Sequence, residues 1–154
     1  MTYAAIRVRG TVNVNPNVKK TLQLLNLTRS NHCAIIEETP ITKGMLNVAK
    51  DYITWGEIEK DVLSKLINSR AKLKGDKQLT DEYLKTATSY GTVNKLTEAI
   101  LENKFKYKDI PNIKPIFRLN PPKKGYEGIK RSYKNKGALG YRGKDINKLI
   151  ERMI

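Results

Sequence analysis

Lysine and arginine side chains gather near the C-terminus of this sequence at a density that suits one kind of chemistry, the neutralisation of phosphate groups. The span from Arg118 to Lys144 contains nine basic residues and the single acid Glu127. The basic residues are Arg118, Lys123, Lys124, Lys130, Arg131, Lys134, Lys136, Arg142 and Lys144. Glycines in the same span allow the backbone to approach a sugar-phosphate surface closely. The segment is therefore expected to contact a polyphosphate.

Three tyrosines are interspersed among these cations. Tyr126, Tyr133 and Tyr141 can stack on unpaired bases or pack on riboses. A stretch with so few apolar residues cannot offset the entropy of ordering its chain, so we expect it to be mobile until a partner binds. A solvated loop whose charge only aids solubility is the alternative interpretation. Against that alternative, Asp145 is expected to cap a final amphipathic helix that returns the chain to the folded body.

The sequence offers few groups for catalysis or metal binding. His32 and Cys33 are the only histidine and cysteine, and a structural zinc usually takes four ligands. No P-loop or H-E-x-x-H motif is present, and acids at 57, 59 and 61 are explained by the dipole of a helix start. We therefore expect no enzyme activity, no metal, no cofactor and no small-molecule substrate. An enzyme or accessory factor that processes structured RNA remains the alternative.

The overall charge points to the same partner class. Lys plus Arg number 30 and Asp plus Glu 15 in 154 residues, a formal charge of +15, which a polyanion would offset. No run of about 18 apolar residues exists for a membrane span, and the basic stretch has no large apolar face to lie on a membrane. RNA is favoured over DNA because no DNA-binding motif is apparent and the cations lie in loops and at strand edges. The lone cysteine fits a reducing compartment, so a soluble intracellular protein is expected.

The first expected strand alternates apolar and charged side chains. Ala4, Ile6 and Val8 fall on one face, whereas Arg7 and Arg9 fall on the other. This period of two predicts a half-buried strand whose outer face is cationic.

Strands and helices then alternate to the end of the first third. Asn15 and Pro16 mark the start of one helix, and a second is expected to be capped by Thr42. The apolar positions of the second helix are Met45, Val48, Ala49, Tyr52 and Ile53. Further strands are expected over residues 32–38 and 53–58. This βαβαβ order predicts an α+β, ferredoxin-like sandwich in which both helices cover one sheet face and leave the other free for a ligand.

The rest of the chain is expected to extend this core. Helices are predicted over residues 57–73 and after the caps Thr80 and Thr92, and a strand is predicted over residues 115–120. The expected units are a core domain (1–58), a helical extension packed on it (59–112), and a basic Gly/Tyr-rich segment closed by a C-terminal helix (113–154).

Several short motifs in the core carry a family resemblance. They are Lys20-Thr21-Leu22 with Leu25 and Leu27, Arg29 with Asn31, Thr39-Pro40, Gly44-Met45-Leu46, and Val48 with Tyr52. In this combination the chain resembles the large-subunit ribosomal protein family called L-thirty in bacteria and L-seven in eukaryotes. The resemblance covers residues 3 to about 58. The extension to residue 154 is similar to archaeal and eukaryotic members, and the absence of a long basic N-terminal arm favours the archaeal form.

The resemblance implies a ferredoxin-like core, no catalysis, and a cytoplasmic place in the large ribosomal subunit among neighbouring ribosomal proteins. It also implies RNA contact at matching positions, with the N–H groups at the second helix start cradling a phosphate. These positions are Arg7, Arg9, Lys19, Lys20, Arg29, Asn31, His32, Thr42, Lys43 and Gly44.

Overall fold

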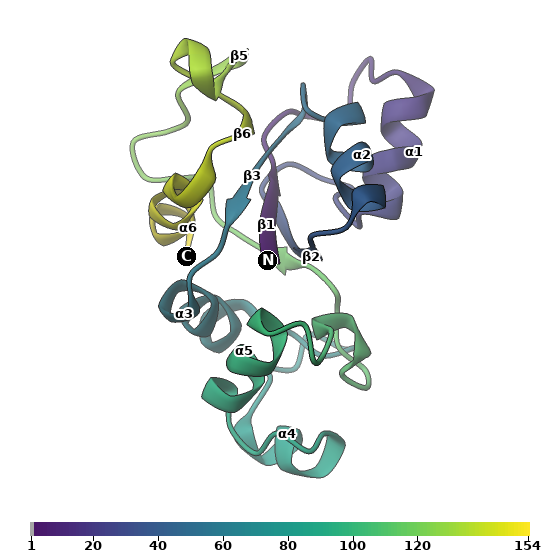
Figure 1. The fold of residues 1–154 in the computed structure, drawn as a ribbon, viewed down its shortest axis with the longest axis vertical. Helices are drawn as coiled ribbons and strands as arrows, with labels where there is room; N and C mark the ends of the chain where they lie inside the picture. The colour runs from purple at the N-terminus through teal and green to yellow at the C-terminus, as the bar shows by residue number, and fades with distance from the viewer. Residues whose placement is uncertain (1) are drawn as a thin grey trace.

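Three antiparallel strands form the centre of the fold, and all of them come from the first third of the chain (Figure 1). The computed structural model describes residues 2–154. β1 (Thr2–Arg7) lies between β2 (His32–Glu37) and β3 (Ile53–Glu57) and runs antiparallel to both. β2 and β3 are therefore parallel, with β1 inserted between them, which is the split β-α-β arrangement. The predicted α+β, ferredoxin-like core is confirmed.

Two helices cover one face of this sheet. α1 (Pro16–Leu24) and α2 (Pro40–Val48) pack Leu22 and Leu46, both fully buried, into one cluster with Tyr3 and Ala5 of β1. The Asn15 side chain accepts a hydrogen bond from the backbone N–H of Asn17, so the predicted cap of α1 is confirmed.

The second helix begins earlier than the sequence suggested. Thr39 is its N-cap: Thr39 Oγ1 accepts from the Thr42 N–H at 3.1 Å, and Thr42 Oγ1 accepts from the Thr39 N–H at 2.9 Å. Thr42 is therefore the third residue of the helix and completes a capping box with Thr39. The prediction that Thr42 is the N-cap is wrong. The predicted apolar stripe is also wrong in part, because the helix ends at Val48 and Ile53 already belongs to β3.

The opposite face of the sheet is covered as well. α3 (Lys60–Arg70), α5 (Val93–Leu101) and α6 (Ile146–Met153) lie on the side away from α1 and α2 (Figure 1). Their buried side chains, including Leu63 and Leu66, share one cluster with Ala4 and Ile6 of β1. The expectation that this face is free for a ligand is wrong. β1 is buried on both faces, because the face that carries Arg7 also carries the apolar side chains of Tyr3 and Ala5. The arginine in this pattern suggested a solvent-exposed face.

The middle of the chain is helical with shorter elements than expected. α3 starts at Lys60, so Glu57 lies in β3 and only Asp61 falls in the first turn. α4 (Asp81–Ala87) and α5 are capped by the side chains of Thr80 and Thr92, as predicted. A 3₁₀ turn, η1 (Tyr107–Asp109), follows before the chain returns to the sheet. Among residues 2–154, no helix combines the length and apolar character that a bilayer crossing requires.

The C-terminal segment extends the sheet on both sides. β4 (Phe117–Arg118) pairs with the start of β2, and β6 (Gly137–Tyr141) runs parallel to β3 with β5 (Gly128–Ser132) outside it. The sheet order is β4-β2-β1-β3-β6-β5. Short 3₁₀ turns, η2 (Tyr133–Asn135) and η3 (Gly143–Asp145), precede β6 and α6.

The structure gives this segment strands and buried contacts, because Ala138 and Leu139 of β6 are buried against Val8. Its mobility before a partner binds stays a prediction, and the expected role of Asp145 is corrected. Asp145 makes no side-chain capping bond to α6; its carboxylate accepts a hydrogen bond from the Tyr133 hydroxyl. The apolar face of the final helix is confirmed, since Ile146, Leu149, Ile150 and Met153 are all buried.

Candidate nucleic-acid interface

The strand directions bring several predicted cations to one end of the sheet. Arg7 ends β1 and pairs with Ile53 at the start of β3, while His32 starts β2 and pairs with Arg118 of β4. Because β3 and β6 are parallel, Gly137 and the η2 turn also lie at this end. We call it the basic end; Figure 1 shows it at the top, away from α3, α4 and α5.

Arg7 does not lie on an outer cationic face. Its side chain is 3% exposed, and it donates to the backbone oxygens of Leu27 at 2.9 Å, Gly10 at 3.1 Å and Arg9 at 3.0 Å. The prediction of an outward Arg7 is wrong, because those carbonyls satisfy its donors inside the protein. Arg7 thus ties the loop after β1 to the loop after α1.

The neighbouring cations are more accessible. Arg9 is half-buried, with its guanidinium carbon 5.0 Å from the centre of the Tyr52 ring. Lys19 and Lys20 are exposed on α1, and Lys19 lines a small cavity together with Arg7 and other residues of the basic end. Because these side chains already reach solvent, they can neutralise phosphates without a rearrangement of the protein.

The loop before β2 combines an exposed cation with two partly buried polar groups. Arg29 is exposed, and Asn31 has a left-handed backbone (φ 65°) and accepts a hydrogen bond from the Tyr126 hydroxyl at 2.6 Å. His32 is half-buried, and burial together with nearby Arg118, Arg29 and Arg7 lowers its pKa below the usual 6.5. Its Nδ1 has no hydrogen-bond partner within residues 2–154. These surroundings favour the neutral form of the imidazole.

The start of α2, where a phosphate cradle was predicted, does not lie at the basic end. Thr42, Lys43 and Gly44 follow the far end of β2, where Glu37 pairs with Thr2. The Thr42 and Lys43 N–H groups already donate to Thr39, and Lys43 Nζ lies 2.7 Å from Glu38. The N–H groups of Thr42 and Lys43 are therefore already hydrogen-bonded within the protein.

The densest set of accessible cations lies on β5 and the turn that follows it. Four side chains are exposed and form neither an ion pair nor a side-chain hydrogen bond within residues 2–154. They are Lys130, Arg131, Lys134 and Lys136. Lys136 has a left-handed backbone (φ 61°), which turns the chain into β6. We call these four residues the β5–η2 cations.

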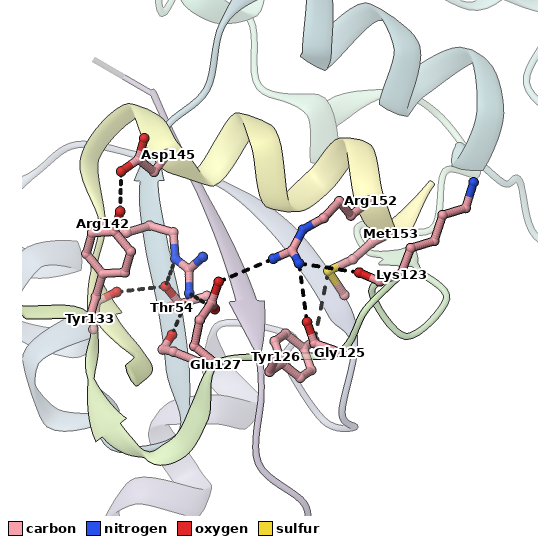
Figure 2. Close-up of polar contacts among 12 residues, drawn as sticks. Thr54, Lys123, Gly125, Tyr126, Glu127, Tyr133, Arg142, Asp145, Arg152 and Met153 are labelled. Atoms are coloured by element: carbon pink, nitrogen blue, oxygen red, sulfur yellow. Dashed lines mark hydrogen bonds and ion pairs between the residues drawn. The ribbon is translucent and has the colours of Figure 1, made fainter. Parts of the chain in front are cut away.

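Arg142 holds this turn against the core and is not exposed. Figure 2 shows its guanidinium reaching Thr54 of β3: Nε donates to Thr54 Oγ1 at 2.8 Å, and Nη2 donates to the Ala138 carbonyl at 2.8 Å. The side chain lies 5.0 Å over the Tyr133 ring, and burial lowers its pKa. Glu127 Oε2 is 3.8 Å from Arg142 and balances its charge.

The three tyrosines are also engaged by the protein. Tyr126 is half-buried beneath Asn31, and burial raises its pKa. Tyr133 donates to Asp145. Tyr141 is 45% exposed and packs beside Trp55, while a hydrogen bond to Glu57 and burial raise its pKa to about 12. Of the three, Tyr141 has the ring most open to a base.

The remaining predicted cations are spread over the surface. Lys123, Lys124 and Lys144 are exposed, and Arg118 lies 3.7 Å from Asp76. Sequence reasoning missed Arg152, which donates to the carbonyls of Lys123 and Gly125 and fixes the loop that leads to β5 (Figure 2). Its position in an amphipathic helix gave no signal of this contact.

The single cysteine is buried, and residues 2–154 hold no cluster of metal ligands. Cys33 is fully buried, which raises the pKa of its thiol to about 12, so no thiolate is available at neutral pH. Within residues 2–154, no group of three or more His, Cys, Asp and Glu side chains is placed to hold a metal ion.

Comparison with known proteins identifies the family of this chain. Residues 3–53 match the family model described as ribosomal protein L30p/L7e. The chain is 49% identical over 152 residues to large ribosomal subunit protein uL30 of Methanosphaera stadtmanae, with 99% of each chain covered. It is 48% identical to the protein of that name from Thermoplasma volcanium (98% of this chain, 92% of the relative) and 45% identical to that from Archaeoglobus fulgidus (98% and 99%). The chain therefore belongs to the ribosomal protein L30p/L7e family.

Proposed function

We propose that this protein is a structural component of the large ribosomal subunit in the cytoplasm and that it binds folded ribosomal RNA with its basic end. The observation that carries the proposal is the set of β5–η2 cations, which are exposed and unpaired within residues 2–154 and lie at the edge of the sheet. The near full-length identity to proteins named as large-subunit components supports it. Neighbouring ribosomal proteins are the other partners, and no catalytic role is proposed.

The mechanism is charge neutralisation by a pre-formed surface. Each cation that meets a phosphate releases a condensed counterion, which favours binding and makes it sensitive to salt. Arg7 and Arg142 act as positioning residues in this proposal, because their donors are satisfied by the protein. The phosphate contacts are supplied by Arg9, Lys19, Lys20, Arg29 and the β5–η2 cations. Because the turn is held by β6 and Arg142, less ordering entropy is lost on binding.

The experiment that tests this proposal removes charge at one place and compares it with the same change elsewhere. Changing Lys130, Arg131, Lys134 and Lys136 together to Gln should weaken binding to purified large-subunit ribosomal RNA by about tenfold or more at physiological salt. The thermal midpoint should hardly change, since the four side chains are exposed. A filter-binding titration and a thermal melt measure the two quantities.

The matched control carries an equal loss of charge on the helical extension. Lys74, Lys77, Lys85 and Lys95 are exposed and make no ion pair within residues 2–154. Changing these four to Gln should alter RNA affinity far less. Equal losses in the two variants would show that net charge, not the basic end, drives binding, and the proposed interface would be abandoned.

A further inference from the structure

A groove beside the outer edge of β2 has no role in the proposed RNA contact. Its volume is about 510 Å³, and it lies between the α1–α2 layer and residues 103–108. Leu24, Ile41 and Met45 line one wall, and Phe105 and Tyr107 line the other. The residues of β2 from 34 to 37 form part of its lining.

The strand edge in this groove is open. β4 pairs only with His32 and Cys33, so among residues 2–154 β2 has no partner strand on this side from Ala34 onward. None of the backbone hydrogen bonds within residues 2–154 joins Ala34, Ile35 or Ile36 to the segment across the groove. An unpaired edge presents alternate N–H and C=O groups that accept another extended chain. β4 already pairs with the same edge of β2 at His32 and Cys33, directly before the unpaired residues.

The groove walls carry apolar side chains that the fold leaves exposed. Leu24 is 65% exposed and Ile41 is 77% exposed, and both line the groove. Large apolar side chains gathered at one place on a surface typically mark a contact with another protein. Together with the open edge, they favour an occupant whose side chains alternate across a strand.

Charge on the groove narrows the choice of occupant. Lys106 and Lys108 are exposed on the rim, and Lys106 Nζ lies 3.9 Å from the Glu37 carboxylate. An acidic side chain on the occupant would meet the two lysines. A phosphate backbone fits less well, because the lining is mostly apolar and includes Glu37. A second copy would bring together two chains that each carry +15.

We propose that the open edge of β2, Ala34–Ile36, binds an extended segment of a neighbouring protein as an added strand. The edge ends at Glu37, whose backbone carbonyl accepts a hydrogen bond from the Thr42 hydroxyl at 2.7 Å. The segment places apolar side chains between Ile41 and Phe105 at alternate positions and an acidic side chain near Lys106. The edge spans roughly three residues, or about 10 Å, so a short segment fills it. This proposal rests on the proposed function in one respect, because the partner is expected to be another protein of the large subunit.

The first test uses the tagged full chain in purified large subunits. The photoreactive residue p-benzoylphenylalanine in place of Ile41 should crosslink to one peptide of another subunit protein, identified by mass spectrometry. The same residue in place of Val48, which is exposed on α2 but does not line the groove, is the control. Crosslinks to RNA alone, no protein product from position 41, or the same product from both positions would refute the added strand. Absence of the tagged chain from the subunits would count against the proposed function instead.

The second test examines the backbone contact directly. The crosslinked peptide, made synthetically, should bind the purified chain, and Ile41→Lys should weaken this binding at least about tenfold while Val48→Lys leaves it unchanged. A version methylated on alternate backbone nitrogens should lose binding, because it cannot donate to the β2 edge. Equal binding by the methylated peptide would overturn the proposal. Ile41→Lys should keep full affinity for ribosomal RNA, which separates this site from the basic end.

Discussion

At the scale of single residues, two arginines that the sequence suggested as RNA ligands are internal supports. Arg7 and Arg142 are 3% and 5% exposed, and each donates to backbone carbonyls. A guanidinium suits this task because its donors are arranged in a rigid fork and it stays charged. Lysine or arginine in a basic stretch therefore does not identify a phosphate contact until its burial is known.

Replacing Arg142 tests its structural role. Arg142→Met should lower the free energy of unfolding by about 2 to 4 kcal/mol, because Thr54 and the Ala138 carbonyl lose a buried charged donor. Lys144→Met, at an exposed neighbouring position, should change it by less than about 0.5 kcal/mol. Urea unfolding followed by circular dichroism measures both. A stable Arg142→Met protein with weak RNA binding would instead make Arg142 a direct contact.

At the scale of elements, the sheet is covered on both faces, so α3, α5 and α6 belong to the same hydrophobic core as β1. Ala4 and Ile6 share a cluster with Leu66 and Leu149, although these residues are far apart in sequence. The basic β5–η2 turn is attached to the same sheet, because β6 joins it beside β3. Helical extension and basic segment are thus positioned by the first three strands.

A core substitution on α3 tests this shared packing. Leu66 is fully buried, and Leu66→Ala should destabilise the whole protein by about 2 to 5 kcal/mol through lost apolar burial and a cavity. Unfolding should remain a single transition by circular dichroism and by Trp55 fluorescence. Leu24→Ala, at an exposed position, should be nearly neutral. Loss of helical signal while Trp55 stays native would show that the extension unfolds independently of the sheet.

At the scale of the whole molecule, charge is distributed unevenly. Residues 57–112 carry 11 basic and 9 acidic side chains, while residues 113–154 carry 12 basic and 3 acidic. The fold places the balanced helical part at one end and the β5–η2 cations at the other (Figure 1). An asymmetric charge of this kind orients the protein on a polyanion and leaves its opposite end for other contacts.

Salt dependence measures how many phosphates the basic end neutralises. If six or more are contacted, affinity for ribosomal RNA should fall by orders of magnitude between about 50 and 200 mM salt. The four-residue β5–η2 variant should lower the slope of log affinity against log salt by about four, or about one for each lost contact. The extension control should keep the original slope. A shallow slope for the unaltered protein would contradict phosphate neutralisation as the main source of affinity.

The sequence by itself determined several helix starts and the order of the first three strands, and its charge indicated the partner class. The starts of α1, α4 and α5 are predicted from Asn15 with Pro16, Thr80 and Thr92, because these side chains cap their helices through short-range hydrogen bonds. The same kind of signal is wrong at Thr42 and Asp145. The family motifs and the concentration of charge likewise depend only on residue order. The fold class followed because the strand and helix order restricts the ways in which apolar faces can be buried.

Only the tertiary structure decided which face of β1 each layer covers, which cations are exposed and where the sheet edge stays open. Arg7 and Lys130 look alike in sequence, yet one is satisfied by the Leu27 carbonyl and the other has no partner within residues 2–154. The open edge at Ala34–Ile36 exists because β4 is only two residues long. These features depend on contacts between segments distant in the chain, and a local pattern holds no information about them.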